Sequence, residues 1–503
     1  MSKFEVIAKD FNSPFFRNYI WTACWDKFAE LWDVPRLLLF TVAEKESLKY
    51  VGDLQSWTVV HQIFRERVSQ DPQYLDGIVT QTMAFGEKFN RWSEKYLVRP
   101  DLRHLSGEEL TARYQEFAEK QATLYAYGVV MPTMDFLSFS FVEEGLKKYQ
   151  GQPFTEREFA DFFRVFTYPC RPSFAEEQET DLLRLLAKYE NDGKWRTMVL
   201  EKTAQEIKES FPTFWKRLEK HTEKYDWVYF VYRGPKYKAE DFLGFLREYI
   251  RQGTKAKEKL EANRQERRDI EKKQRQYLKQ LHPTAAEKAF LRFAGRLVWS
   301  KPRRKDLQSR SYSHLENLHK ELARRLCLTL NQVRSLPLDQ VGPALRTGQV
   351  DTDYLNAIYD FHVCLPEKEG IRILAGAAGR EYFQKEITAE QGNRNTVRIL
   401  SGNCAQVGTV KGRVRIINRP EEMEKMQDGD VLVSVATTPS LVPAIRRAGA
   451  IVTYEGGLTC HASIVSREFK IPCVVGTKIA TQVLQDGQMV KVDADKGIVE
   501  VVE

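Results

Sequence analysis

The spacing of apolar residues changes near residue 397, and this change constrains the fold more than any other feature of the sequence. Up to about residue 385, apolar residues recur every three or four positions and glycine is sparse, as in LTARYQEFAEKQATLYAYG at residues 110–128. Such spacing is typical of amphipathic helices. After residue 397, short runs rich in valine and isoleucine are bounded by glycine, proline or aspartate, which is typical of strands.

These patterns predict an α+β protein with two unequal parts. Residues 1–385 are expected to form a large all-α region that binds a substrate or a partner and could comprise two subdomains. Residues 386–397 contain the polar stretch TAEQGNRNT and are expected to form a linker. Residues 398–503 are expected to form a compact β/β/α domain, because about a hundred residues suffice for an independent unit.

Composition narrows the class of protein. The 503-residue chain carries a formal net charge of +8, and its apolar runs fall far short of the ~20 residues that a membrane span needs. The first thirty residues do not show the pattern of a signal peptide. The seven cysteines are scattered, without a Cys-x-x-Cys or Cys/His cluster. We therefore expect a cytoplasmic globular protein with reduced thiols, no membrane contact and no metal site of its own.

Two local signals mark helices in the first part. Ser106 stands three residues before Glu109, the spacing of a capping box at a helix start. Residues 254–281 form a long charged stretch without glycine or proline, which predicts an exposed or coiled-coil-like helix that ends near Pro283. This stretch is basic, but acidic residues alternate with its cations. A solvated helix is therefore favoured over an RNA-binding surface, and nucleic acid is not an expected partner.

A histidine follows a glycine turn in TYEGGLTCHASIVSRE, residues 453–468. Gly456 and Gly457 follow an expected strand and lack side chains, so another group can approach the turn closely. Thr459 stands where the N-cap of the next helix is expected, which places His461 in the first turn. The unpaired N–H groups and the dipole of a helix start favour an anion and disfavour an imidazolium.

Two interpretations of His461 follow from this position. A neutral imidazole is a nucleophile, and a phosphoryl group on it would meet the N–H donors of the helix start, with Thr459 and Arg467 as further donors. An isolated histidine near a helix start, however, is more often a capping or packing residue. Position alone leaves both interpretations open.

The longer segment GGLTCHASIVSREFKIPCVVG, residues 456–476, resembles the phosphohistidine segment of the phosphoenolpyruvate-utilising enzymes. This family includes phosphoenolpyruvate synthase, pyruvate phosphate dikinase and rifampicin phosphotransferase. The upstream LVSVATTPSLVPAIRRAGAIVTYEGG and the closing DGQMVKVDADKGIVEV are similar to the family as well. The resemblance implies a swivelling domain whose histidine carries a phosphoryl group between two distant active sites.

Carried over to this chain, the resemblance gives the carrier role to His461. It places Gly456, Gly457 and Thr459 in the phosphate-binding surroundings of that histidine, and Arg467 is a further candidate there. Two other positions depart from the family: Ser440 and Tyr454 stand where acidic residues are common in the relatives. These departures leave the details of docking open but do not affect the histidine.

Complete enzymes of this family also need a nucleotide-binding ATP-grasp domain or a barrel that binds phosphoenolpyruvate. The sequence contains no Gly-x-x-x-x-Gly-Lys-Ser/Thr loop, and no glycine-rich strand and turn occur in the first 385 residues. We therefore expect no cofactor bound by this chain alone, with ATP and Mg²⁺ or phosphoenolpyruvate taking part in the full reaction. An ATP-grasp protein in trans and a small-molecule acceptor are the expected partners. The alternative is a non-catalytic interaction or regulatory protein that retains the swivelling fold.

Other chemistry-bearing residues are weaker candidates. His314 and His319 are five residues apart, a spacing that does not place both on one helix face as metal ligands. Arg303, Arg304 and Arg310 form a basic cluster that could hold an anionic substrate, although a solvated helix face is the favoured interpretation.

Overall fold

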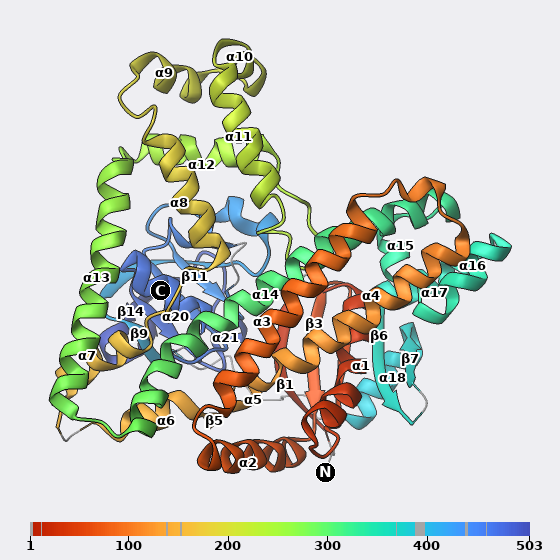
Figure 1. The fold of residues 1–503 in the computed structure, drawn as a ribbon, viewed down its shortest axis with the longest axis horizontal. Helices are drawn as coiled ribbons and strands as arrows, with labels where there is room; N and C mark the ends of the chain where they lie inside the picture. Colours follow the sequence, from red (N-terminus) through yellow and green to blue (C-terminus); the bar gives the residue numbers. More distant parts are fainter. Residues whose placement is uncertain are drawn as a thin grey trace. The chain divides into compact units, whose positions relative to one another are not determined.

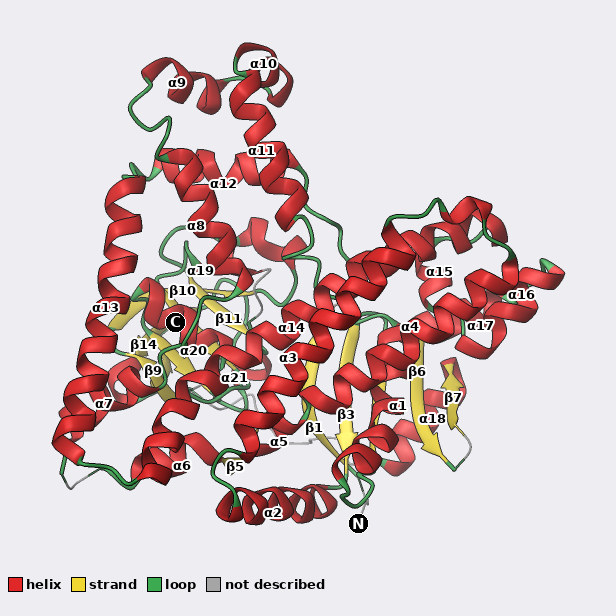
Figure 2. Ribbon diagram, in the orientation of Figure 1, coloured by secondary structure: helices red, strands yellow, loops and turns green. Residues whose placement is uncertain are grey.

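The computed structural model describes residues 4–11, 13–136, 139–150, 153–368, 370–387, 398–437, 441–458 and 460–502. Contacts along the backbone divide the chain into two compact units (Figures 1 and 2). The first comprises residues 1–145 and 314–503, and the second comprises residues 146–313. The prediction of an α+β fold is confirmed, because a large helical region accompanies a sheet domain formed by the C-terminal residues. Within the described residues, no helix is long and apolar enough to cross a membrane.

A five-stranded antiparallel sheet forms the N-terminal part of the first unit, in the order β1-β3-β2-β6-β7. Its strands are β1 (Glu5–Phe11), β2 (Leu39–Glu44), β3 (Ser47–Gly52), β6 (Phe361–Glu367) and β7 (Gly370–Ala375). The expectation that residues 1–385 are all helical is therefore wrong. Thr41 of β2 pairs with Cys364 of β6, so the sheet joins segments far apart in the sequence, which local spacing does not disclose.

Helices surround this sheet. Helix α1 packs against β2 on the sheet and against α4, and the apolar residues Phe40, Val51 and Val363 lie in a buried cluster of the sheet. The capping box predicted at Ser106 and Glu109 is present at the start of α4. Apart from a long helix that the two units share, the other elements of the first unit before the linker are α1 (Phe15–Trp32), α2 (Leu54–Gln70), α3 (Tyr74–Ser93), η1 (Glu94–Val98), η2 (Leu102–His104), α4 (Gly107–Gly128), α5 (Val130–Met134), β4 (Asp135–Phe136), β5 (Phe139–Ser140), α6 (Phe141–Lys147), α15 (Leu330–Arg334), η3 (Leu338–Gln340), α16 (Val341–Thr347), α17 (Thr352–Asp360) and α18 (Gly376–Glu386).

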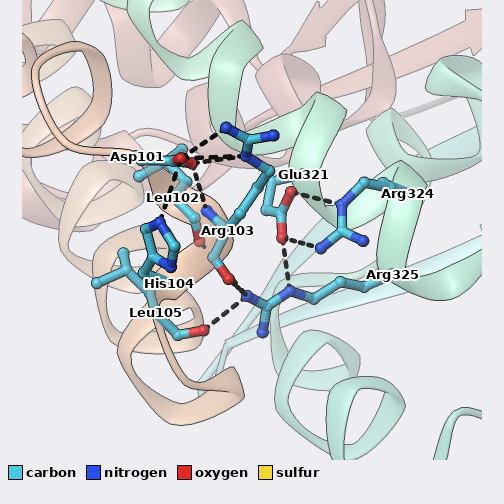
Figure 3. A network of polar contacts seen from close by, with 8 residues as sticks. All are labelled: Asp101, Leu102, Arg103, His104, Leu105, Glu321, Arg324 and Arg325. Carbon is cyan, nitrogen blue, oxygen red and sulfur yellow. Dashed lines mark hydrogen bonds and ion pairs between the residues drawn. The ribbon is translucent and has the colours of Figure 1, made fainter.

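A polar network ties the end of the long helix α14 (Ala285–Leu326) to the turn before α4 (Figure 3). Glu321 pairs with both Arg324 and Arg325 at 2.7 Å. The Arg325 guanidinium also donates to the Leu105 carbonyl at 2.6 Å, while Asp101 pairs with its neighbour Arg103. Because carbonyls of the turn accept from the helix, the network fixes the entry of the chain into α4.

The second unit is helical and has its own core. Trp195, Phe214, Phe242 and Leu246 are among its buried residues. The unit contains α7 (Glu156–Phe166), α8 (Phe174–Leu186), α9 (Gly193–Glu201), α10 (Ala204–Ser210), α11 (Pro212–Tyr225), α12 (Ala239–Arg251), α13 (Ala256–Leu281) and the first part of α14.

Helix α13 corresponds to the long charged helix predicted at residues 254–281. It ends at His282, whose φ of 45° is left-handed, and Pro283 follows. Only Ala256, Leu260 and Ile270 of its residues are buried, and the helix packs against α7 and α8. Its remaining charged surface is therefore largely solvated, as the sequence indicates.

The C-terminal residues form an eight-stranded mixed sheet in the order β8-β15-β14-β10-β11-β12-β13-β9. The central strands β10 to β13 run parallel to one another, and the outer pairs are antiparallel. The elements are β8 (Ile399–Ser401), β9 (Asn403–Gln406), β10 (Thr409–Ile416), η4 (Pro420–Lys425), β11 (Val431–Ser434), α19 (Val442–Ile445), β12 (Ala450–Thr453), α20 (His461–Phe469), β13 (Cys473–Val475), α21 (Ala480–Val483), β14 (Met489–Asp493), η6 (Ala494–Lys496) and β15 (Ile498–Val501).

Both faces of the central strands are buried. Leu432 and Ile451 lie in one apolar cluster, together with residues of α19 and α20. Val433 and Val452, their neighbours along the strands, lie in a second cluster with residues of α21. Successive side chains of a strand point to opposite faces, so the continuous apolar runs of this region are explained by burial on both sides. Most of the expected linker, residues 388–397, lies outside the described residues.

Candidate functional site

The candidate site is the loop of residues 454–460, which joins strand β12 to helix α20. Strand β12 is buried between the parallel strands β11 and β13. Helix α20 starts at His461, so the histidine lies in the first turn as predicted. The N-cap is Cys460, one residue later than the expected Thr459, and its side chain makes no capping hydrogen bond. Thr459 itself lies outside the described residues.

The His461 ring is oriented by a residue that the sequence did not single out. The Nδ1 atom of His461 lies 2.8 Å from the Oγ1 atom of Thr437, in the segment that follows strand β11. Thr437 is buried, whereas His461 is only half-buried. Because β11 and β12 are parallel neighbours, their carboxyl ends bring these two segments together. A hydrogen bond at one ring nitrogen sets the orientation of the ring.

The two glycines of the loop have different roles. Gly456 has a φ of +112°, and a Cβ atom there would lie 2.7 Å from the Cys460 Sγ atom. The backbone of the loop therefore requires glycine at position 456. A Cβ atom at Gly457 would meet nothing within 4 Å. Both residues are exposed, so another group can approach the loop at Gly457 without displacing the chain.

Side chains within the domain bind three carbonyl groups of the loop. Thr453 Oγ1 donates to the Glu455 carbonyl at 2.6 Å, and Ser463 Oγ donates to the Gly457 carbonyl at 2.8 Å. The Arg467 guanidinium donates to the carbonyls of Leu458 and of Ala405, the latter at 3.0 Å. These bonds fix the loop and are made by residues that sequence reasoning missed, Arg467 excepted. The predicted contact of Arg467 with a phosphate stays a prediction, since the contacts described here give it the role of a brace.

The weaker candidates have other partners within their own units. His314 contacts Ser93 Oγ at 2.8 Å, and His319 contacts Tyr114 at 3.4 Å, so the two histidines have separate buried partners. Arg303 pairs with Glu177 at 3.1 Å and lies over the ring of Phe174, which makes it a packing residue within the second unit. Among the residues that the structure describes, no group of three or more His, Cys, Asp or Glu is arranged to hold a metal ion.

Comparison with known proteins bears on the same segment. Residues 426–497 match the family model described as PEP-utilising enzyme, mobile domain. The C-terminal sheet domain contains the whole of this match and is called the mobile domain after it. The chain is 55% identical over 101 residues to a probable phosphoenolpyruvate synthase of Archaeoglobus fulgidus, a match that covers 20% of this chain and 13% of that protein. It is 39% identical over 163 residues to the phosphoenolpyruvate synthase of Pyrococcus furiosus, which covers 32% of this chain and 20% of that protein.

A third relative also matches only part of the chain. The chain is 50% identical over 114 residues to a probable phosphoenolpyruvate synthase of Methanothermobacter thermautotrophicus, covering 23% of this chain and 17% of that protein. The chain thus spans a fifth or less of the length of the three curated relatives. The resemblance to PEP-utilising enzymes is confirmed for the mobile domain, which is homologous to a part of these synthases.

Proposed function

We propose that this chain is a phosphotransferase component in which His461 carries a phosphoryl group. The observation that carries the proposal is the geometry of the histidine: His461 is the first residue of a helix without a side-chain cap, and its Nδ1 atom is hydrogen-bonded to Thr437. An uncapped helix start supplies N–H donors and a positive dipole end to a phosphoryl group. The homology of the mobile domain to phosphoenolpyruvate synthases supports the same chemistry.

In the proposed transfer, Nδ1–H donates to Thr437 Oγ1 and Nε2 keeps its lone pair. Nε2 attacks the phosphorus atom of the donor, and the bond from phosphorus to the leaving oxygen breaks with its electron pair on the donor. The positive charge that forms on the ring is stabilised by the hydrogen bond from Nδ1–H to Thr437 Oγ1. In the return step, an acceptor oxygen attacks phosphorus, the P–N electron pair returns to Nε2, and the acceptor proton passes to solvent.

The proposal assigns the donor site to a second protein. An ATP-grasp protein in trans would supply ATP and Mg²⁺, or another chain would supply phosphoenolpyruvate, and the residues before the linker would bind the small-molecule acceptor. The chain would then act as the carrier between these two sites. Each match covers a fifth or less of the synthase, which is compatible with donor and acceptor sites on separate chains.

Isotope transfer tests the proposal. The full chain is incubated with β-labelled ATP, γ-labelled ATP or labelled phosphoenolpyruvate, with and without any ATP-grasp protein encoded beside it. We expect acid-labile, base-stable label on the wild type and none on His461→Ala. The donor that gives label identifies the reaction.

Folding of the variants is checked by circular dichroism, since His461 is half-buried and its loss could disturb the helix start. If the folded wild type takes no label from any donor in any combination, the carrier proposal fails. The non-catalytic interaction protein then becomes the better interpretation.

A further inference from the structure

The first strand of the N-terminal sheet has a free edge in the described structure. Strand β1 pairs with β3 on one side, and from Glu5 to Phe11 no other described strand pairs with it. A free edge exposes backbone N–H and C=O groups that need partners. One of these groups, the Lys9 N–H, donates to the Glu455 Oε1 atom at 2.8 Å. Glu455 belongs to the loop that leads to His461.

Two further contacts join the same surfaces of the first unit. The Lys9 ammonium lies 4.8 Å from the centre of the Tyr454 ring, and Tyr454 is buried. The guanidinium of Arg419, which follows strand β10, lies 3.8 Å from the carboxylate of Glu46 in the turn between β2 and β3. Two segments of the mobile domain therefore contact two neighbouring parts of the N-terminal sheet.

The Glu455 carboxyl group lies in an environment that disfavours its charge. Burial raises its pKa from the ordinary 4.5 to about 7, and the nearby Asp10 on β1 acts in the same direction. The Lys9 N–H, the Lys9 ammonium and Lys478 on the mobile domain oppose this shift without cancelling it. A free loop exposes the same carboxyl group to water, where its pKa is ordinary.

We propose that the free edge of strand β1 is the docking station for the phosphohistidine loop, and that Glu455 is the positioning residue that holds the loop there when neutral and weakens the contact when charged. The proposal rests on the proposed function for its purpose, because docking of this loop brings the start of α20 to the N-terminal sheet domain.

Docking of the loop is linked to protonation of the Glu455 carboxyl group. The docked carboxyl binds a proton more tightly than the free one, so docking weakens as the pH rises from about 4.5 to about 7 and is constant above that range. Between pH 6 and pH 8, the docking equilibrium constant is expected to fall about tenfold. A neutral amide at this position removes the dependence while it keeps an oxygen that accepts from Lys9.

Hydrogen exchange at the Lys9 amide measures docking directly, because this N–H donates to the Glu455 carboxyl group of the loop. The full chain is examined at residue resolution at pH 6 and pH 8, with rates corrected for the intrinsic pH dependence of exchange. In the wild type we expect the protection of Lys9 to fall about tenfold from pH 6 to pH 8. Glu455→Gln is expected to keep protection at both pH values, and Glu455→Ala to lose it at both.

Two controls separate docking from folding. Amides that pair β1 with β3 report whether the sheet is intact, and Glu500→Gln removes an exposed carboxylate on strand β15 of the same domain without changing Lys9. Equal protection of Lys9 in the wild type at both pH values, or full protection in Glu455→Ala, would overturn the proposal.

The measurement needs no phosphoryl donor, so its result is independent of the isotope experiment. Exchange in His461→Ala shows the docking contact alone. Label on His461 without pH-dependent protection refutes the docking station only. Protection without label refutes the carrier function only.

Discussion

A single added methyl group at Gly456 tests whether the loop before His461 is as tightly determined as its geometry indicates. Gly456→Ala forces a residue with a side chain to adopt a φ of +112°, which costs about 1–2 kcal/mol. The new Cβ atom also meets Cys460 Sγ at 2.7 Å. The sulfur can rotate away, but it then loses its contact with Ser463 Oγ at 3.3 Å, at a further cost of about 1 kcal/mol. We expect the mobile domain to lose about 2–3 kcal/mol of stability.

The neighbouring glycine provides the matched control. Gly457→Ala adds the same methyl group one residue later, where nothing lies within 4 Å of it. Its effect on stability is expected to lie within about 0.5 kcal/mol. Hydrogen exchange of the amides in strands β11, β12 and β13 of the full chain gives the free energy of opening of this domain, and intact α13 amides show that the second unit is unaffected.

The double variant Gly456→Ala/Cys460→Ala separates the two contributions. It removes the sulfur but keeps the left-handed φ. In the Cys460→Ala background, we therefore expect Gly456→Ala to cost about 1 kcal/mol less stability than it costs in the wild type. Equal stability of the two single glycine variants would refute the reasoning. Full recovery in the double variant would show that the backbone tolerates a side chain at position 456 and that only the sulfur matters.

Three further predictions concern residues outside the loop. Thr437→Val keeps the volume but removes the partner of His461 Nδ1, and we expect a three- to tenfold slower labelling of His461 in rapid-quench experiments, equivalent to about 1 kcal/mol. Burial raises the pKa of Asp306 to about 7, so the stability of the folded chain should fall as the pH rises from about 4 to about 7, and Asp306→Asn should remove this slope in urea unfolding. Arg334→Met leaves buried Glu316 without its 2.8 Å partner and should cost about 3–5 kcal/mol in the same assay, whereas an unchanged midpoint would contradict it.

The helix start at His461 could be predicted because its signals are local. Glycines, a short polar residue and an apolar stripe follow one another within a dozen positions, and these determine where a strand ends and a helix begins. The N-cap differs by one residue, Cys460 instead of Thr459, which is the usual uncertainty of helix boundaries. The long charged helix and the capping box at Ser106 were predictable for the same reason.

The N-terminal sheet was not predictable from local spacing. Strands β2 and β3 are six residues each, and they stand between long helical patterns that dominate the composition. Strand β3 pairs with β1 and β2, and β2 pairs in turn with β6. The pairing of β2 with β6 and the apolar cluster that includes Phe40 and Phe361 are contacts made across most of the chain. A run of six apolar or mixed residues is compatible with a helix turn as well as with a strand, so only tertiary pairing decides between them.

Thr437 and Arg467 show why site residues are harder to predict than site position. Thr437 lies in a stretch that resembles the family, but its contact with His461 arises only because β11 and β12 are neighbours in the sheet. The charge of Arg467 is visible in the sequence, whereas the direction of its guanidinium is not. The structure directs it to the loop carbonyl of Leu458 and to the Ala405 carbonyl on strand β9.

A carrier histidine has two requirements that conflict. Its ring must be exposed enough to reach different partners, yet oriented well enough to present one nitrogen to each of them. The mobile domain divides these requirements between two residues: buried Thr437 orients the ring at Nδ1, and His461 itself stays half-buried. The loop around it is held through its carbonyl groups by Thr453, Ser463 and Arg467, all within the same domain. Because these contacts lie within one domain, the proposed docking and release at Lys9 would leave the geometry of His461 unchanged.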